Sequence, residues 1–179
     1  AMINPRVLLL VAAANMSAHA LAEISSDVIY GHKDGMALVY DAFHADKPNG
    51  AGIVYMVSGG WFSMWQNPAQ RVRQFQPLLN AGFAVFAVHH GSAPRFKVPD
   101  AVSDARAALR HIRSNAADYG VDPNRLGVWG GSAGGHLSLM LGLNAEAKPI
   151  QPEGEGFERF MAPNYAAGAD TEASLAAVV

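Results

Sequence analysis

The sequence predicts an α/β fold in three layers, with a mostly parallel β-sheet between helices and an antiparallel hairpin at its N-terminal edge. Three short apolar runs bounded by turn residues are typical of buried strands, and they are Ile53–Val57, Phe83–Val88 and Leu126–Trp129. Segments with helical spacing of apolar residues separate these runs. Strands that alternate with helices favour a parallel sheet that is covered on both faces.

The hairpin is expected within residues 26–46. Val28–Tyr30 and Ala37–Phe43 are rich in β-branched and aromatic residues, and Gly31–Gly35 between them has the composition of a turn. Lys47–Gly50 contains Pro-Asn-Gly and predicts a second turn before the first buried strand.

Three helices are expected after the buried strands. Residues 68–80 have apolar residues on one face, although Pro77 is a potential breaker of this helix. A second helix is expected to begin near Pro99, because apolar residues then recur at spacings of three and four: Val102, Ala105, Leu109 and Ile112. Asp122–Asn124 predicts a turn, and His136–Leu143 is helical in pattern after the third strand.

Composition narrows the classes of function. The 179 residues are half apolar, which is enough for one domain, and 16% are charged with a net charge of -2. This composition does not suggest nucleic-acid binding. The chain has no cysteine, which excludes disulfides, thiol nucleophiles and thiolate metal sites. No spacing typical of a zinc site is present, so neither a metal nor another cofactor is expected.

Residues 1–22 have the pattern of an export signal. Arg6 supplies a positive charge, Val7–Ala14 is apolar, and Ala18–Ala20 fits the small-x-small cleavage rule. The run is too short to span a membrane, which takes about 20 apolar residues. We therefore expect a secreted or periplasmic domain over 23–179; the alternative is a buried N-terminal helix.

Ser132 is the strongest candidate for a catalytic residue, because Gly130–Gly134 reads Gly-x-Ser-x-Gly between a predicted strand and a predicted helix. In such a turn the strand reverses sharply and presents the serine in a strained conformation. Glycines at both ends let strand and helix approach closely. The N–H of Ala133 then points to a developing oxyanion, aided by the helix dipole. The alternative is a glycine-rich turn with an ordinary serine.

A second glycine-rich loop follows the first buried strand. Gly59 and Gly60 offer N–H groups that an oxyanion can reach unhindered, and the alternative is a plain turn at the end of a strand. Trp61 comes next and is a candidate for an apolar pocket or for core packing. His89 and His90, at the end of a strand, are further candidates to line the site, and one of them is a candidate for a substitute base, although most such histidines are structural.

Gly127–His136 (GVWGGSAGGH), preceded by Tyr119–Arg125 (YGVDPNR), resembles the α/β-hydrolase esterases of the hormone-sensitive-lipase and feruloyl-esterase-like group. The resemblance runs from about Val28 to Leu143 and weakly to Val179. It implies a carboxylic ester hydrolase, an acetyl or feruloyl esterase among the candidates, that forms an acyl-enzyme. By this resemblance Ser132 is the nucleophile, and the oxyanion donors are Ala133, Gly59 and Gly60.

The sequence departs from that family in three places. The family loop reads His-Gly-Gly-Gly-Trp where this chain has Val57 and Ser58 as its first two residues, and Asp-Tyr-Arg is replaced by His89–Gly91. The triad order in this fold is Ser, then Asp or Glu, then His, but the only histidine after Ser132 is His136, four residues on. The family's acid and base follow strands that this sequence does not contain.

The chain therefore resembles the N-terminal part of a hydrolase. Residues 144–172 are expected to form a long acidic surface excursion, and Leu175–Val179 is expected to begin another core strand. A cleaved or partial protein, a chain that takes its base from another copy, and a non-catalytic module are the three explanations. An exposed sheet edge predicts association with another chain or with the missing part. Small-molecule ester hydrolysis is the main hypothesis; a peptidase and a non-catalytic module are the alternatives.

Overall fold

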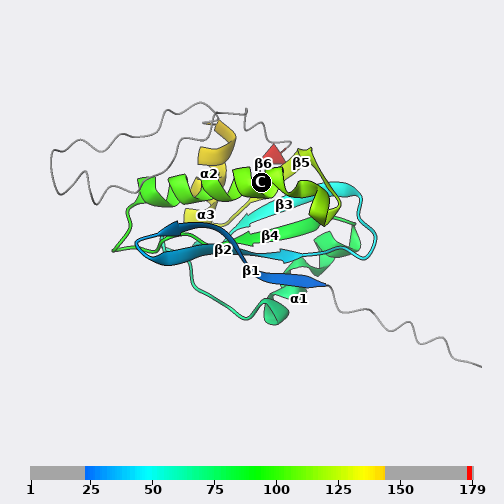
Figure 1. Ribbon diagram of the computed structural model, residues 1–179, viewed down its shortest axis with the longest axis horizontal. Coiled ribbons are helices and arrows are strands. Elements are labelled where there is room, and N and C mark those ends of the chain that lie inside the picture. Colours follow the sequence, from blue (N-terminus) through cyan, green and yellow to red (C-terminus); the bar gives the residue numbers. More distant parts are fainter. Residues whose placement is uncertain (1–22, 144–176, 179) are drawn as a thin grey trace, which may run out of the picture.

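The computed structural model of the chain describes residues 23–143 together with residues 177 and 178. Figure 1 shows its elements in the order β1 (Ile24–Lys33), β2 (Met36–Phe43), β3 (Gly50–Met56), α1 (Pro68–Asn80), β4 (Ala84–Val88), α2 (Val98–Ser114), a short 3₁₀ turn η1 (Ala116–Tyr119), β5 (Val121–Trp129), α3 (Ala133–Leu143) and β6 (Ala177–Val178).

The strands form one mixed sheet in the order β1-β2-β4-β3-β5-β6. The pairs β1–β2 and β2–β4 are antiparallel, whereas β4–β3, β3–β5 and β5–β6 are parallel. The predicted sheet, mostly parallel with an antiparallel N-terminal hairpin at one edge, is therefore confirmed. Because β3 lies between β4 and β5, the carboxyl ends of all three strands meet at one edge of the sheet, which is where ligands bind in α/β folds.

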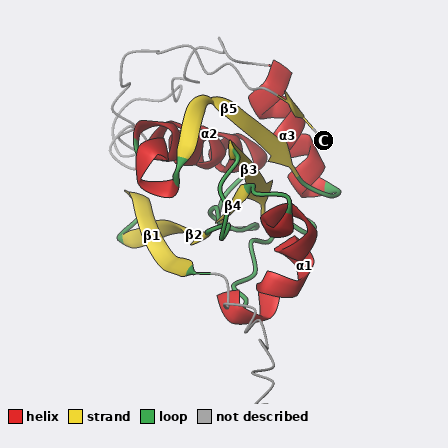
Figure 2. Cartoon of the chain, turned by 90° about the vertical axis from the view of Figure 1, so that its right-hand side faces the viewer, coloured by secondary structure: helices red, strands yellow, loops and turns green. Residues whose placement is uncertain are grey.

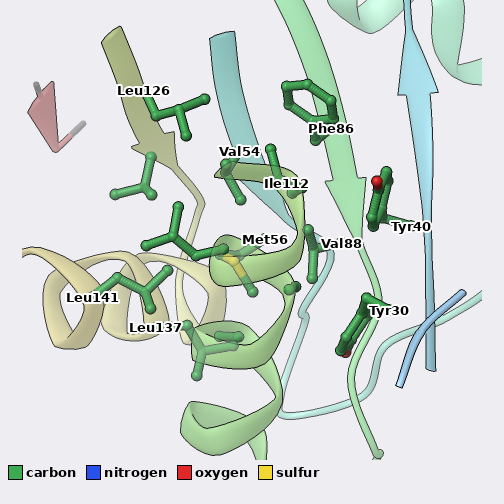
Figure 3. Close-up of a cluster of buried hydrophobic side chains, with 14 of the residues drawn as sticks. Tyr30, Tyr40, Val54, Met56, Phe86, Val88, Ile112, Leu126, Leu137 and Leu141 are labelled. Carbon is green, nitrogen blue, oxygen red and sulfur yellow. The ribbon is translucent and has the colours of Figure 1, made fainter. Parts of the chain in front are cut away.

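Helices cover both faces of the sheet, as predicted. Figure 2 shows α2 and α3 on one side of the strands and α1 on the other. The larger buried cluster joins the sheet to α2 and α3, through residues such as Tyr40, Val54, Phe86, Ile112 and Leu137 (Figure 3). The smaller cluster joins the opposite face to α1, through Phe43, Val85, Ala87, Phe75 and Leu79. Val85 and Phe86, which are consecutive, thus face different layers, as a pleated strand requires.

The hairpin turn is tighter than the sequence predicts. The strands continue to Lys33 and restart at Met36, so that only Asp34 and Gly35 form the turn. Both have positive φ, 48° and 77°, which is the conformation of a type I′ turn and the reason that Asp-Gly suits this position. The predicted turn Gly31–Gly35 is therefore longer than the observed one, because residues 31–33 continue strand β1.

Two other boundaries differ from expectation. Helix α1 continues through Pro77 to Asn80, because Phe75 and Leu79 on either side of the proline are buried against the sheet while Pro77 itself is exposed. Packing therefore outweighs the lost backbone hydrogen bond. Strand β5 begins at Val121, so that Asp122–Asn124 lie within an irregular part of the strand and not in a separate turn.

The predictions for residues 1–22 and 144–172 lie outside the described residues. The expected strand at 175–179 corresponds to β6, which pairs with β5 in parallel. No helix among the described residues is long and apolar enough to cross a membrane.

Candidate active site

Ser132 lies in the sharp connection between β5 and α3. Strand β5 ends at Trp129, helix α3 begins at Ala133, and Ser132 has a φ of 52°. Positive φ is unfavourable for a residue with a side chain, so this backbone conformation stores strain. Ser132 is exposed at the surface, whereas Ala133 and Gly134 after it are buried. The turn therefore presents the hydroxyl outward from a fixed backbone.

The glycines around Ser132 are required by close backbone contacts. A Cβ on Gly130 would lie 2.5 Å from the backbone of Gly134, and a Cβ on Gly134 would lie 2.7 Å from the carbonyl oxygen of Met56 at the end of β3. Neither distance occurs between real Cβ atoms and such neighbours. Gly131, by contrast, has nothing within 4 Å of its Cβ position. The strand-to-helix reversal thus depends on two particular glycines of the motif.

The start of α3 offers N–H groups beside Ser132. The first amides of a helix have no partner within the helix, and the helix dipole makes this end favourable for negative charge. The N–H of Gly134 is already used, since it lies 2.9 Å from the oxygen of Gly131 and 3.3 Å from the oxygen of Ser58. This second contact links the serine turn directly to the glycine-rich loop after β3. Ala133 N–H is the first amide of the helix.

The glycine-rich loop forms a tight turn of its own. Gly59 and Phe62 exchange two backbone hydrogen bonds of 3.0 Å, and the two residues between them, Gly60 and Trp61, have φ values of 56° and 67°. These are the features of a type I′ turn. Positive φ is rare for a residue as large as tryptophan. Because the N–H of Gly59 is engaged within the turn, Gly60 is the better placed of the two glycines to donate to a ligand.

Trp61 and His136 connect the loop to α3. Their rings meet edge to face with centroids 5.2 Å apart. His136 lies in the first turn of α3, where its N–H donates to the oxygen of Ser132. Trp61 is half-buried, so it contributes both to packing and to the surface near the serine turn. The predicted site residues Ser132, Ala133, Gly60 and Trp61 therefore belong to one connected region.

His90 is buried beneath the loop and is 5% exposed. Its Nδ1 lies 2.8 Å from the oxygen of Gly91, and its Nε2 lies 2.8 Å from the Oγ of Ser58. Burial lowers the pKa of His90 because it disfavours the charged ring, a tendency that its hydrogen bond with Gly91 opposes. The residue predicted to line the site is thus a bonded partner of the loop.

His89, the second histidine expected to line the site, contacts the other end of the loop. Its Nδ1 lies 3.2 Å from the Oγ of Ser63, and its Nε2 lies 3.8 Å from Oδ2 of Asp41. The pattern of the sequence does not reveal these contacts, because Asp41 lies in β2 and Ser63 in the loop after β3, both far from His89 in the sequence. The paired histidines at the end of a strand were the only available signal.

A cavity of about 380 Å³ lies next to these histidines, between the start of β2 and the segment after β4. Its walls are mainly apolar and include Leu38, Val39 and Phe96, with Arg95 among the lining residues. His89 and His90 line it as well, and the same two histidines contact Ser63 and Ser58 of the glycine-rich loop.

Comparison with known proteins shows which family the chain is similar to. The family model described as BD-FAE matches residues 40–179. The chain is 30% identical over 113 residues to a probable carboxylic ester hydrolase, LipM, of Mycobacterium tuberculosis, covering 63% of this chain and 26% of that protein. It is 33% identical over 108 residues to an acetylxylan esterase of Xylanibacter ruminicola, covering 60% of this chain and 22% of that protein.

Among solved structures, the chain resembles an esterase of Thermogutta terrifontis, Est2, with a TM-score of 0.59 and 28% identity. The match covers 76% of this chain and 48% of that protein. The same esterase phosphoramylated by tabun matches with a TM-score of 0.59 and 29% identity, over 76% of this chain and 51% of that one. The chain thus spans about a quarter of the curated relatives and about half of the solved esterases.

Proposed function

Because the chain belongs to the BD-FAE family and has the α/β-hydrolase fold of esterases, we propose that it supplies the nucleophile and the oxyanion donors of a serine carboxylic ester hydrolase. The observation that carries this proposal is the positive φ of Ser132 in a strand-to-helix turn that only glycines can close. An ordinary serine in a loop needs neither that strain nor those contacts.

In the proposed reaction the Oγ of Ser132 attacks the carbonyl carbon of an ester. The carbonyl oxygen becomes negatively charged, and the N–H groups of Ala133 and Gly60 stabilise it, with Gly59 as the remaining loop candidate. Loss of the alcohol leaves an acyl-enzyme, which water hydrolyses to the free acid. The amides are fixed before the reaction begins, by α3 in one case and by the turn Gly59–Phe62 in the other.

The reaction also needs a general base and an acid to orient it. His136 is the only histidine after Ser132 in the sequence, but its ring packs against Trp61 and its backbone is part of the helix that follows the nucleophile. We therefore propose that the base and its acid are supplied from outside this sequence, by another part of the protein in the Ser, acid, His order of the fold or by a second chain.

The ester's acid is proposed to be small or aromatic, an acetyl or feruloyl group. The acetylxylan esterase among the relatives supports the first of these. Secretion or export to the periplasm is part of the same proposal and rests on residues 1–22, whose charged start, apolar run and small residues match an export signal.

The test is hydrolysis of p-nitrophenyl acetate by the full-length protein and its Ser132→Ala variant, with Ser26→Ala as the control because Ser26 is an exposed serine of β1, at the far edge of the sheet. We expect hydrolysis and covalent labelling by a fluorophosphonate probe in the wild type and the control, and neither in Ser132→Ala. Equal rates in all three would refute the role of Ser132.

Two rival functions give different results in the same assay. A peptidase on this fold would cleave peptide substrates and leave simple esters intact, while still labelling at Ser132. A non-catalytic module would neither hydrolyse the ester nor react with the probe.

A further inference from the structure

Two consecutive histidines at the end of β4 hold the two ends of the glycine-rich loop. His90 contacts Ser58 at the start of the loop, and His89 contacts Ser63 at its end, through the ring-nitrogen contacts of 2.8 Å and 3.2 Å. Both histidines are buried, at 5% and 8% exposure. The loop residues between the two serines include the turn at Gly60 and Trp61. We call the loop Ser58–Ser63 the oxyanion loop and the two histidine–serine contacts the histidine clamp.

Backbone groups reinforce the histidine clamp at the end that contains Ser63. The N–H of His90 donates to the Oγ of Ser63 at 3.2 Å, and the N–H of Ser63 donates to the Oγ of Ser92 at 2.9 Å. The N–H of Ala93 donates to the oxygen of Trp61 at 3.0 Å. The segment after β4 therefore holds the oxyanion loop by side chains and backbone together.

The tautomer of His90 follows from its partners. A carbonyl oxygen can only accept, so the contact with Gly91 requires a proton on Nδ1. In the neutral ring Nε2 then carries a lone pair, and it accepts the hydroxyl proton of Ser58. Because burial lowers the pKa of this histidine, the neutral ring is the form that the folded protein favours.

The clamp reaches the nucleophile through Ser58. The side chain of Ser58 contacts His90, while its carbonyl oxygen accepts the N–H of Gly134 at 3.3 Å, two residues after Ser132. The same residue thus links the end of β4 to the start of α3. This link fixes the start of the oxyanion loop relative to the start of α3.

The oxyanion loop needs such support for a physical reason. It contains Gly59 and Gly60, which have large backbone freedom, and it holds Trp61 at a φ of 67°, which costs free energy. A loop of this kind relaxes unless neighbouring groups fix it. An oxyanion donor that moves by about 1 Å loses on the order of a hundredfold in rate.

We propose that His89 and His90 are positioning residues, which hold the oxyanion loop, and the Gly60 amide within it, in a fixed position relative to the turn at Ser132. This inference rests on the proposed function for its effect on rate, but the clamp itself is a property of the folded chain. Neither histidine touches the reacting ester; each acts through a serine of the loop.

The first test is a double-mutant cycle in the full-length protein with Ser58→Ala, His90→Leu and both together. Each single variant is expected to lower kcat by about ten- to a hundredfold, in line with the loss of oxyanion stabilisation, with KM within about twofold of the wild type. The double variant is expected to lose no more than one of the singles, because both remove the same contact.

Two further variants, one conservative and one distant from the loop, serve as controls for the cycle. His90→Gln keeps an acceptor near the position of Nε2 and is expected to recover part of the lost kcat, whereas His32→Gln, at an exposed position of β1, is expected to leave it unchanged. Fully additive losses in the double variant, or a change in KM without a change in kcat, would overturn the positioning role.

A second measurement does not depend on esterase activity. Amide hydrogen exchange is expected to speed up by at least about tenfold at residues 59–62 in Ser58→Ala and His90→Leu, with exchange in α1 unchanged. The ¹⁵N shifts of the His90 ring are expected to show the Nδ1–H tautomer in the wild type. If the wild type hydrolyses no ester yet these results appear, the proposed function fails and the clamp stands. Unchanged exchange in the loop refutes the clamp.

Discussion

Lys33 and Asp104 form an ion pair in the interior, with Nζ 2.7 Å from Oδ1 and side chains that are 1% and 0% exposed. Lys33 ends β1, and Asp104 lies in α2. The other carboxylate oxygen of Asp104 accepts the N–H of Gly91 at 2.9 Å. The pair therefore joins the N-terminal hairpin, the helix layer and the segment that follows the two histidines.

Removing one partner of this pair is expected to lower the stability of the fold strongly. Asp104→Ala leaves the Lys33 ammonium buried without its carboxylate and should lower the free energy of unfolding by about 3–5 kcal/mol. The double variant Lys33→Met/Asp104→Leu should lose much less, because neither charge is then buried alone. Urea unfolding measures both.

The exposed pair of Arg95 and Asp34, at 3.2 Å, provides the comparison. Arg95→Gln is expected to change the free energy of unfolding by less than about 1 kcal/mol, because water screens an exposed pair. If Asp104→Ala were as mild as Arg95→Gln, the buried pair would not hold the three segments together.

Substitution of the glycines around Ser132 should show which of them the turn requires for close backbone contacts. Gly134→Ala places a methyl group 2.7 Å from the oxygen of Met56, which forces the end of β3 and the start of α3 apart. We expect ester hydrolysis to fall at least about a hundredfold, because Ser132 and its oxyanion donors then move relative to each other. Gly131→Ala adds the same methyl group in open space and should keep most of the activity. Similar losses in the two variants would contradict this account.

Much of this arrangement is predictable from the sequence because it is local. The Gly-x-Ser-x-Gly segment and the strand before it lie in one short stretch, and a turn of a few residues is determined by its own glycines. The layer order follows from the alternation of apolar runs and helical segments. Pro77 shows the limit of local rules, since the burial of Phe75 and Leu79 on the sheet overrides the tendency of proline to end a helix.

The histidine clamp is not predictable in the same way, because its partners are distant in sequence. Ser58 and His90 are separated by 32 residues, and only the parallel pairing of β3 with β4 brings the ends of those strands together. The hydrogen bond from the Gly59 N–H to the oxygen of Phe62 is also not predictable from the sequence, because it depends on the backbone conformation of the turn. Sequence shows which residue types end each strand, and the sheet order decides which of them meet.

The strained backbone at Ser132 predicts an unusual effect on stability. A φ of 52° is unfavourable for serine and alanine but not for glycine, so Ser132→Gly should be more stable than Ser132→Ala by about 1 kcal/mol. Ser103, within α2, provides the opposite case: there the glycine variant should be less stable than the alanine variant by about 1 kcal/mol. Thermal or urea unfolding of the four variants tests the difference. The same sign at both positions would show that Ser132 is not strained.

Tyr40 predicts how stability changes at high pH. Burial raises the pKa of its hydroxyl, and the hydrogen bond with Tyr119, 2.9 Å from oxygen to oxygen, raises it further. Above the pKa of about 10 that tyrosine has in the unfolded chain, the unfolded state loses this proton while the folded state keeps it. The folded state then binds more protons, so its stability falls as pH rises, by up to about 1.4 kcal/mol per pH unit from this group.

Tyr40→Phe is expected to remove that part of the alkaline loss. At pH 8 the variant should be less stable by about 1 kcal/mol, because the hydroxyl also lies 3.2 Å from Nδ1 of His111 and both contacts disappear. Between pH 10 and 11 its stability should decline less steeply than that of the wild type. Urea unfolding at both pH values measures the two slopes, with Tyr55→Phe, in the half-buried ring of β3, as the matched control. Parallel slopes for Tyr40→Phe and the wild type would mean that Tyr40 ionises in the folded chain as readily as in the unfolded one.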